Sequence, residues 1–565
     1  MDYKDKYQSW LDSDIISEEF KAELRAIADN DEEIKDRFLN DLEFGTAGLR
    51  GKIGAGTNRM NIYMVGLATQ GLALTIKDHG EEAVKRGVSI GYDVRHKSKE
   101  FAEITARVLA ANGIKANLHK DIVPTPVLSY TVRKLHSIAG VMVTASHNPK
   151  EYNGYKAYWE EGSQILDNIA DAILAGIEKT GGFENVKLVS LEEGLASGLI
   201  EYVDEKLIDE YIEEVKAIAI EDGENLDKEV RVVYSPLNGC GNKLVRRILA
   251  ERGFTNVFVV KEQEEPDPDF TTVGYPNPEF EAAFEYSIRL GKEKDADLLI
   301  ATDPDSDRTA LEVKDKDGEY VFLTGNKIGT LLINYILERL SAKGQLPENP
   351  AIVKSIVTTD FPKAIAKEYD VEVLDVLTGF KNIFAPANVW DETHEKNFVF
   401  GYEESIGYCY GSFVRDKDAV NSAMMIVEMA AFYKKQGKSL LDVLNDLYEK
   451  YGYYGEKNVS IVLEGLDGQA LIGRIMEDYR ANPIEEIDGA KLEKVIDYKF
   501  DETGLPKSNV LKYLYSDGSW FVVRPSGTEP KIKLYIYTYA KDKASSDAKV
   551  QTIYDVANAK IQAVE

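Results

Sequence analysis

The chain has 565 residues, which is too long for a single hydrophobic core and, at roughly 150 residues per domain, predicts about four domains. Its net charge of -29 argues against nucleic acid or an anionic membrane as a partner, and a phosphate site would need local basic residues and a metal. With only two cysteines, no export signal and no long apolar run, we expect a soluble cytoplasmic protein, monomeric or weakly homo-oligomeric.

Residues 1–40 have a helical, charge-rich pattern and are expected to extend the first domain. A β-rich segment at 88–92 is then followed by a polar turn containing Asp93 and Arg95, an amphipathic helix and a second strand. The same order recurs at 230–260 and at 351–377. This repetition predicts three similar α/β domains, each contributing one polar loop to a shared cleft. Three unrelated α/β domains are the alternative.

The apolar segment 138–143 is typical of a strand buried on both faces, and it ends shortly before Ser146. Because chemistry in open α/β sheets gathers beyond the carboxyl ends of strands, we interpret this turn as a phosphoryl-transfer site rather than an incidental polar turn. His147 and Lys156 are expected to bind phosphate or to exchange protons with a substrate hydroxyl. A Ser-His hydrolase is disfavoured, since Thr144 stands where the nucleophile elbow needs glycine.

Three carboxylates, Asp303, Asp305 and Asp307, alternate directly after the apolar strand 298–301. They can converge on a hard divalent cation, and Mg²⁺ is the natural candidate. An EF-hand is excluded because Arg308 occupies the position where that loop needs glycine. A simple Asp-Pro-Asp turn is the alternative, but three buried carboxylates would repel one another without a cation. A phosphate ester on Ser146 would supply a further anionic ligand.

Two later loops suit a phosphosugar. Glu403 and Ser405, after the strand expected at 397–400, offer acceptors and a donor for vicinal hydroxyls, although a solvated turn would look the same. The run 448–455 is rich in glycine and tyrosine and is interpreted as a hinge into a smaller α+β domain. That domain carries a glycine-containing turn suited to a phosphate dianion, formed by Arg524, Ser526, Gly527 and Thr528.

These loops, in this order, resemble those of the α-D-phosphohexomutase family. Residues 144–149 resemble its phosphoserine loop, 303–308 its Mg²⁺ loop, 402–405 its sugar loop and 524–530 its phosphate loop. Residues 45–50 resemble an N-terminal family motif that includes Thr46. The long subgroup, which includes bacterial phosphoglucomutases and related phosphopentomutases, is the nearest match in length and in the runs around Glu403 and Lys417.

The resemblance implies that Ser146 is phosphorylated and binds Mg²⁺ together with Asp303, Asp305 and Asp307, assisted by Arg50 and Lys156. It implies substrate contacts by Thr46, Arg308, Thr378, Gly379, Lys381, Glu403, Ser405 and Lys417. The implied fold is three similar α/β domains with mixed sheets plus a smaller C-terminal α+β domain around a central cleft. We expect the domains at residues 1–205, 206–323, 324–450 and 451–565.

The implied reaction interconverts a hexose 1-phosphate and its 6-phosphate through a 1,6-bisphosphate, which must turn around between two transfers. Closure of the last domain would exclude water. Glucose is the expected sugar, with glucose 1,6-bisphosphate as intermediate and activator, and mannose or a pentose is the alternative. A phosphosugar phosphatase and a non-catalytic phosphosugar-binding protein remain as alternatives of a different class.

Overall fold

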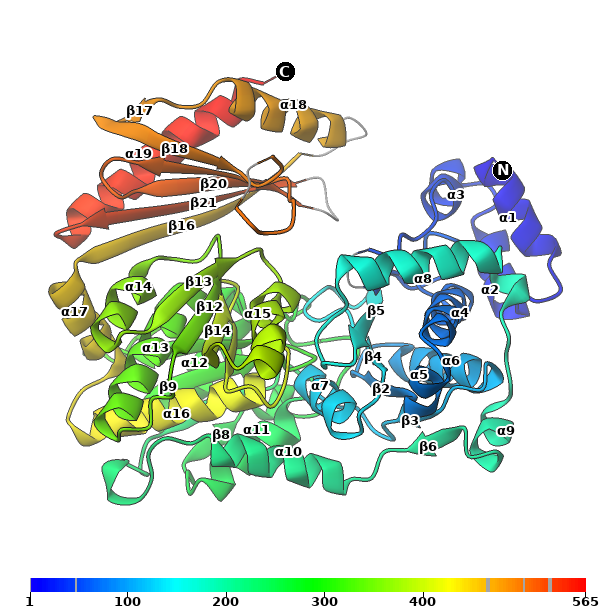
Figure 1. Ribbon diagram of the computed structural model, residues 1–565, viewed down its shortest axis with the longest axis horizontal. Helices are drawn as coiled ribbons and strands as arrows, with labels where there is room; N and C mark the ends of the chain where they lie inside the picture. The colour runs from blue at the N-terminus through cyan, green and yellow to red at the C-terminus, as the bar shows by residue number, and fades with distance from the viewer. Residues whose placement is uncertain (1, 46–47, 464–467, 501–502, 527–530, 565) are drawn as a thin grey trace.

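The computed structural model describes residues 2–45, 48–463, 468–500, 503–526 and 531–564, and it contains four sheets that lie in sequence along the chain (Figure 1). Each of the first three sheets mixes parallel and antiparallel pairs, and the fourth is antiparallel. The expected fold class is therefore confirmed. Within the described residues, no helix has the length and apolar character needed to cross a membrane.

In the first domain the strand order is β1-β5-β4-β2-β3-β6, and β4 at its centre is buried along its whole length, as expected for a strand covered on both faces. The strands are β1 (Gly48–Lys52), β2 (Val88–Tyr92), β3 (Ala116–Leu118), β4 (Ala139–Val143), β5 (Tyr152–Trp159) and β6 (Ile200–Tyr202). The helices are α4 (Ile62–Asp78), α5 (Glu81–Arg86), α6 (Ser98–Ala111), α7 (Thr125–Lys134), α8 (Asp167–Thr180) and α9 (Leu191–Ala196).

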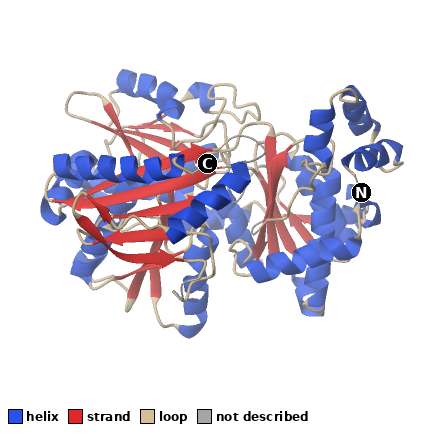
Figure 2. Cartoon of the chain, turned by 90° about the horizontal axis from the view of Figure 1, so that it is seen from above, coloured by secondary structure: helices blue, strands red, loops and turns tan. Residues whose placement is uncertain are grey.

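The expected N-terminal helices are α1 (Tyr3–Asp12), α2 (Glu18–Ala26) and α3 (Asp31–Phe38). They enclose a small aromatic cluster in which the ring of Trp10 meets those of Phe38 and Tyr63 edge to face. Figures 1 and 2 both place these helices at the outer edge of the first domain, away from the fourth sheet.

The second and third domains share one continuous hydrophobic core. The second contains β7 (Val232–Ser235), β8 (Val257–Val259), β9 (Leu298–Thr302), β10 (Thr309–Lys314), β11 (Tyr320–Leu323), α10 (Lys206–Ala217), α11 (Asn242–Glu251) and α12 (Glu285–Lys294). The third contains β12 (Pro350–Ser355), β13 (Glu372–Val376), β14 (Asn397–Glu403), β15 (Gly407–Tyr410), α13 (Gly325–Ala342), α14 (Phe361–Ala366), α15 (Phe380–Thr393), α16 (Ala419–Lys435) and α17 (Leu440–Tyr451).

The three polar loops occupy the same topological position in the three domains. Each loop joins a parallel-paired strand to the antiparallel strand beside it: β4 to β5, β9 to β10, and β14 to β15. Each also contains one non-glycine residue with left-handed backbone geometry, since φ is 53° at Ser146, at Ser306 and at Ile406. Such geometry is costly for these residue types and clusters at functional sites. One expectation is corrected: β14 is longer than expected and includes Glu403.

The fourth domain has the strand order β16-β21-β20-β19-β18-β17. Its elements are β16 (Tyr453–Val462), β17 (Glu486–Ile487), β18 (Ala490–Asp497), β19 (Leu511–Tyr515), β20 (Trp520–Pro525), β21 (Lys531–Ala540), α18 (Gly468–Ala481) and α19 (Lys543–Gln562). Arg524 therefore lies within a strand and not in the turn after it. At the expected hinge α17 ends at Tyr451, β16 begins at Tyr453, and Gly452 between them has a φ of 92°.

Candidate active site

The loop after β4 places Ser146 against the second domain. Its Oγ donates a hydrogen bond to Asp303 Oδ2 at 2.7 Å and lies 3.3 Å from His147 Nδ1. Its backbone N–H is held by Thr144 Oγ1 at 2.8 Å. Arg50, which comes from β1, donates to the side chain of Asn148 in the same loop at 3.2 Å. The first two predicted motifs, far apart in sequence, thus meet through one hydrogen bond.

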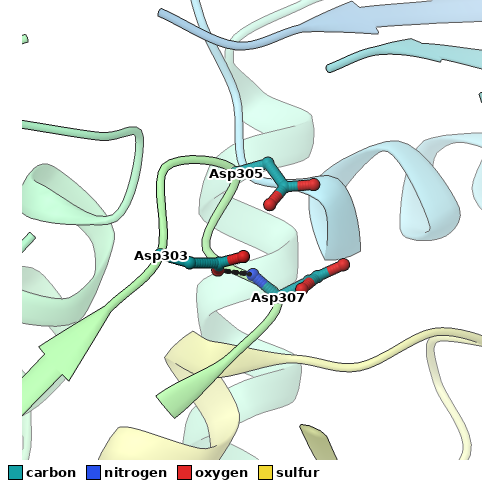
Figure 3. A group of neighbouring side chains, drawn as sticks. All are labelled: Asp303, Asp305 and Asp307. Carbon is teal, nitrogen blue, oxygen red and sulfur yellow. Dashed lines mark hydrogen bonds between the residues drawn. The ribbon is translucent and has the colours of Figure 1, made fainter. Parts of the chain in front are cut away.

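Asp303, Asp305 and Asp307 converge from a single turn (Figure 3), and one ligand atom of each lies within 4.8 Å of the others. Asp303 Oδ1 accepts the backbone N–H groups of Asp307 and Arg308, both at 3.0 Å, which shapes the turn. Burial and the two neighbouring carboxylates raise the pKa of Asp303 well above its ordinary value. Among the described residues, Asp305 Oδ1 and Asp307 Oδ1 are buried without a hydrogen-bond partner. Buried, unpartnered carboxylate oxygens in this number fit a hard divalent cation.

Two lysines from different domains partly compensate this negative charge. Lys156 on β5 lies 2.8 Å from Asp305 Oδ2 and 3.3 Å from Asp307 Oδ2, and Lys417 lies 3.2 Å from the same Asp307 oxygen. Burial lowers the pKa of Lys156, but the Asp305 and Asp307 carboxylates outweigh it and hold the pKa above its ordinary value. For Asp305, burial acts to raise the pKa, but the Lys156 ammonium lowers it by more. The pKa therefore lies below its ordinary value, and this carboxyl is ionised. Burial also lowers the pKa of Lys417, but Asp307 and Asp416 hold it above its ordinary value, so both lysines are charged at the edge of the triad.

A cavity of about 310 Å³ lies where the loops of the three domains meet. It is lined by Gly45, Gly48, Leu49, Arg50, Ser146, Tyr155, Lys156, Gln164, Asp307, Arg308, Gly379, Phe380, Glu403 and Lys417. Most of the expected catalytic and sugar-contacting residues are thus brought together around one space. His147 is half-buried beside it, where burial, Arg308 and Arg50 hold the imidazole pKa well below its ordinary value. A neutral imidazole can accept a proton.

The third-domain residues are arranged around Glu403. Its Oε1 accepts the backbone N–H of Gly379 at 2.6 Å, and Thr378 precedes that glycine with its carbonyl bonded to Asn382 at 2.8 Å. Ser405 is half-buried in the loop itself. Lys381, in contrast, pairs with Asp167 of the first domain at 2.9 Å and is not among the residues that line the cavity.

The phosphate-loop residues lie apart from this cavity. Arg524 donates to Tyr535 Oη at 3.5 Å, Ser526 N–H bonds Lys531 O at 2.8 Å, and neither residue lines the cavity. Burial and the neighbouring Glu403 raise the pKa of Glu404 in the sugar loop to about 7. Arg524 lies close enough to this loop for its positive charge to oppose that rise. The remaining predicted residues, Thr46, Gly527 and Thr528, lie outside the described residues.

Sequence reasoning missed three residues that shape the site. Thr125, the first residue of α7, donates from Oγ1 to Asp305 Oδ2 at 2.9 Å and from its backbone to Asp305 O at 2.8 Å. Asp416 accepts Tyr158 Oη at 2.7 Å and lies 3.1 Å from Lys417 Nζ. Arg95 binds the carbonyls of the Ser146 loop. For Arg95 a signal existed, because it follows β2, the strand that pairs in parallel with β4.

Comparisons with known proteins agree with this architecture. Residues 41–182, 209–318 and 324–451 match phosphoglucomutase/phosphomannomutase alpha/beta/alpha domains I, II and III, and residues 474–550 match the C-terminal domain of the same family. A phosphoglucomutase of Staphylococcus haemolyticus is 35% identical over 544 residues, which cover 94% of this chain and 96% of that protein. One of Staphylococcus epidermidis is 39% identical over 516 residues, with coverages of 89% and 92%.

Solved structures agree in fold at lower sequence identity. The exocytosis-sensitive phosphoprotein pp63/parafusin, a phosphoglucomutase from Paramecium in its open form, superposes with a TM-score of 0.69 at 17% identity, covering 92% of this chain and 95% of that one. A phosphoglucomutase/phosphomannomutase family protein from Burkholderia thailandensis gives 0.67 at 20%, covering 92% and 98%. With four matched domains in order and full-length relatives above 30% identity, the chain belongs to the phosphoglucomutase/phosphomannomutase family, the α-D-phosphohexomutases.

Proposed function

We propose that this protein interconverts α-D-glucose 1-phosphate and glucose 6-phosphate, with Ser146 as phosphate carrier and glucose 1,6-bisphosphate as intermediate and activator. The observation that carries the proposal is the 2.7 Å hydrogen bond from Ser146 Oγ to Asp303 at the wall of the cavity. A serine hydroxyl directly at a three-carboxylate cluster suits phosphoryl transfer. The curated relatives described above, named phosphoglucomutase, support glucose as the sugar.

Mg²⁺ would be held by Asp303, Asp305 and Asp307 together with a phosphate oxygen on Ser146, and the unpartnered oxygens of the triad support this set. When bound, it supplies positive charge that stabilises the transferring phosphoryl group. Lys156 and Lys417 add charge beside the triad, and we assign Arg50 and Arg308 to the phosphate and substrate in the same cavity.

In the first transfer the phosphorus–Oγ bond of Ser146 breaks and a new phosphorus–oxygen bond forms to the free sugar hydroxyl. We assign the hydroxyl proton to His147, whose Nδ1 lies 3.3 Å from Ser146 Oγ and whose imidazole is uncharged before the transfer. The bisphosphate then turns around, and its other phosphoryl group returns to Ser146 while His147 gives the proton back to the sugar oxygen. Both transfers use the same residues in opposite directions, which accounts for reversible isomerisation.

The sugar and its distal phosphate are assigned to the third and fourth domains. Glu403 and Ser405 would bind vicinal hydroxyls, with Thr378, Gly379 and Lys381 as further contacts. The distal phosphate would be bound by Arg524, Ser526, Gly527 and Thr528, and Thr46 would contact substrate from the first domain. Because Arg524 and Ser526 do not line the cavity, this assignment requires the fourth domain to move toward it during turnover.

The direct test is conversion of glucose 1-phosphate to glucose 6-phosphate in the presence of Mg²⁺ and a trace of glucose 1,6-bisphosphate. We expect Ser146→Ala to lose activity by about 1,000-fold or more, since the covalent carrier is removed. Ser137→Ala is the matched control, because Ser137 is also buried in the first domain but its hydroxyl, among the described residues, is hydrogen-bonded only to that of Ser89, at 2.8 Å. Release of inorganic phosphate without isomerisation would instead identify a phosphatase.

The preferred sugar is tested by parallel kcat/KM values for glucose, mannose and ribose 1-phosphates, with glucose expected to give the highest value. A higher value for mannose or ribose would replace glucose in the proposal.

We also propose a cytoplasmic monomer or weak homo-oligomer without nucleic-acid or membrane partners, with domains divided at residues 205, 323 and 450. The charge of -29 and the two buried free cysteines support this, and light scattering would measure the oligomeric state.

A further inference from the structure

We propose that Arg95 is the positioning residue of the phosphate-carrying loop: its guanidinium group fixes the main chain around Ser146 and so sets where Oγ lies relative to Asp303. The inference rests on the proposed function, because it gives a catalytic consequence to the placement of Ser146. Arg95 itself does not line the cavity.

Arg95 makes an unusual set of contacts. One nitrogen, Nη2, donates to Ser146 O at 2.5 Å and to Asn148 O, and the other, Nη1, donates to Pro149 O at 2.8 Å and Tyr152 O at 3.1 Å. A single planar fork thus holds four carbonyl groups between residues 146 and 152. A rigid guanidinium with donors in fixed directions can do this, whereas a single ammonium cannot reach all four in one geometry.

The loop needs such support because its backbone is strained. Ser146 has a φ of 53°, a left-handed conformation that is unfavourable for a non-glycine residue. Its N–H is bound by Thr144 Oγ1 at 2.8 Å. Its carbonyl is bound by Arg95. Both peptide groups of the strained residue are therefore held by side chains, and the one that binds the carbonyl comes from the polar turn after β2.

Arg95 is itself held from both domains that meet at the site. Its backbone N–H donates to Asp93 Oδ1 at 2.9 Å, and its Nε lies 3.4 Å from Asp93 Oδ2. The ring of Phe270, from the second domain, lies 5.1 Å from its guanidinium carbon. Only 3% of Arg95 is exposed, and burying a charge is costly unless its partners are well placed. The Ser146 loop is thereby fixed against the domain that carries the aspartate triad.

The test compares Arg95→Lys and Arg95→Ala with Arg107→Ala in the full-length protein. Arg107 is an arginine of the same domain whose Nε donates to Val189 O at 2.8 Å, away from Ser146. We expect Arg95→Lys to lower kcat by about 100-fold while KM changes less than about threefold, because charge is kept but Ser146 is misplaced. Added guanidinium ion should restore Arg95→Ala by about tenfold and leave Arg107→Ala unchanged.

A second measurement does not depend on activity. Hydrogen exchange of the segment 144–153 should quicken by about tenfold in Arg95→Lys, while the helix α6 of the same domain keeps its protection. The proposal is overturned if Arg95→Lys keeps kcat within threefold of the parent, or if exchange in this segment is unchanged. If the parent protein has no mutase activity, the proposed function fails, and the exchange result still decides the role of Arg95.

Discussion

Among the described residues, a buried cluster of lysine and aspartate and a partly buried one have opposite charge balances. The first, the triad cluster, contains Asp303, Asp305, Asp307, Lys156 and Lys417 at the meeting point of three domains. The second, the seat cluster, lies where the fourth domain rests on the third and contains Lys354, Lys363, Lys512, Asp360 and Asp375. Carboxylates outnumber lysines in the first cluster, and lysines outnumber carboxylates in the second.

In the part of the chain that the structure describes, both clusters contain carboxylate oxygens without a hydrogen bond, so the charge balance, and not hydrogen bonding, separates them. In the seat cluster Lys354 lies 3.3 Å from Asp360 Oδ1 and 2.8 Å from Asp375 Oδ1, and Trp520 Nε1 donates to Asp360 Oδ2 at 2.9 Å. Within the described chain, Asp360 Oδ1 and Asp375 Oδ1 of the seat cluster lack a hydrogen bond, as Asp305 Oδ1 and Asp307 Oδ1 of the triad cluster do. The comparison teaches that an excess of buried carboxylate over lysine indicates a cation site, whereas a cluster with an excess of lysine joins domains.

The largest expected effect sharpens this comparison at the triad. Asp307→Asn removes one carboxylate from the proposed Mg²⁺ site, and the loss of several kcal/mol of charge stabilisation should lower kcat by about 1,000-fold. Calorimetric titration should find weaker Mg²⁺ binding. Asp375→Asn is the matched change in the seat cluster and should leave both Mg²⁺ affinity and kcat within threefold of the parent. Equal losses of kcat and Mg²⁺ affinity in Asp307→Asn and Asp375→Asn would contradict the distinction between the two clusters.

The second prediction reverses the roles and measures stability. Asp375→Ala leaves Lys354, whose side chain is fully buried, with one carboxylate fewer, and should lower the free energy of unfolding by about 3 kcal/mol. Asp303→Asn, measured without Mg²⁺, should raise the free energy of unfolding or leave it unchanged, because it removes a carboxyl whose ionisation burial and the other two carboxylates oppose. Urea denaturation followed by fluorescence measures both. A lower free energy of unfolding for Asp303→Asn, with no loss for Asp375→Ala, would contradict the roles given to the two clusters.

The third prediction concerns pH. Burial lowers the pKa of Lys512 from 10.5 to about 8. Between these two pH values the unfolded chain binds more protons at this residue than the folded chain does. The free energy of unfolding therefore rises with pH, by at most about 1.4 kcal/mol per pH unit. This gain is lost as the pH falls back to 8. Lys512→Met should remove this rise, so that any stability advantage of the variant at pH 7 shrinks toward pH 10. A pH-independent difference between parent and variant would refute it.

The smallest expected effect lies at the exposed border of the first and second domains. Asp269 pairs there with His96 at 3.2 Å and with Lys150 at 3.1 Å, and all three side chains are about half exposed. Exposed pairs contribute about 0–1 kcal/mol, so Asp269→Ala should change the urea midpoint and kcat only slightly. A loss of kcat comparable to that of Asp307→Asn would mean that this surface pair, and not burial, aligns the domains.

Much of this architecture could be predicted from sequence because local signals and the fold agree. The apolar run that became β4, the alternating aspartates and the turn residues are each visible within about ten residues of chain. Their order along the chain also indicated a threefold repeat. The structure explains it, because each of the three loops precedes an antiparallel strand.

The contacts between distant segments could not be predicted in the same way. Thr125, Arg95 and Asp416 act through partners far away in sequence, and no spacing rule links Thr125 to Asp305. Both strand ends lie further along the chain than expected: β14 extends through Glu403 and β20 through Pro525. Pairing with neighbouring strands, and not local composition, decides where a strand stops.

The central claim, that Ser146 carries the phosphate between two positions of one sugar, is tested most directly by peptide mass spectrometry. After incubation with glucose 1,6-bisphosphate and Mg²⁺, the peptide containing Ser146 should gain the mass of one phosphoryl group. Addition of glucose 6-phosphate should remove that mass as the bisphosphate forms. An active protein whose Ser146 never carries phosphate, or whose phosphate goes only to water, would contradict the account.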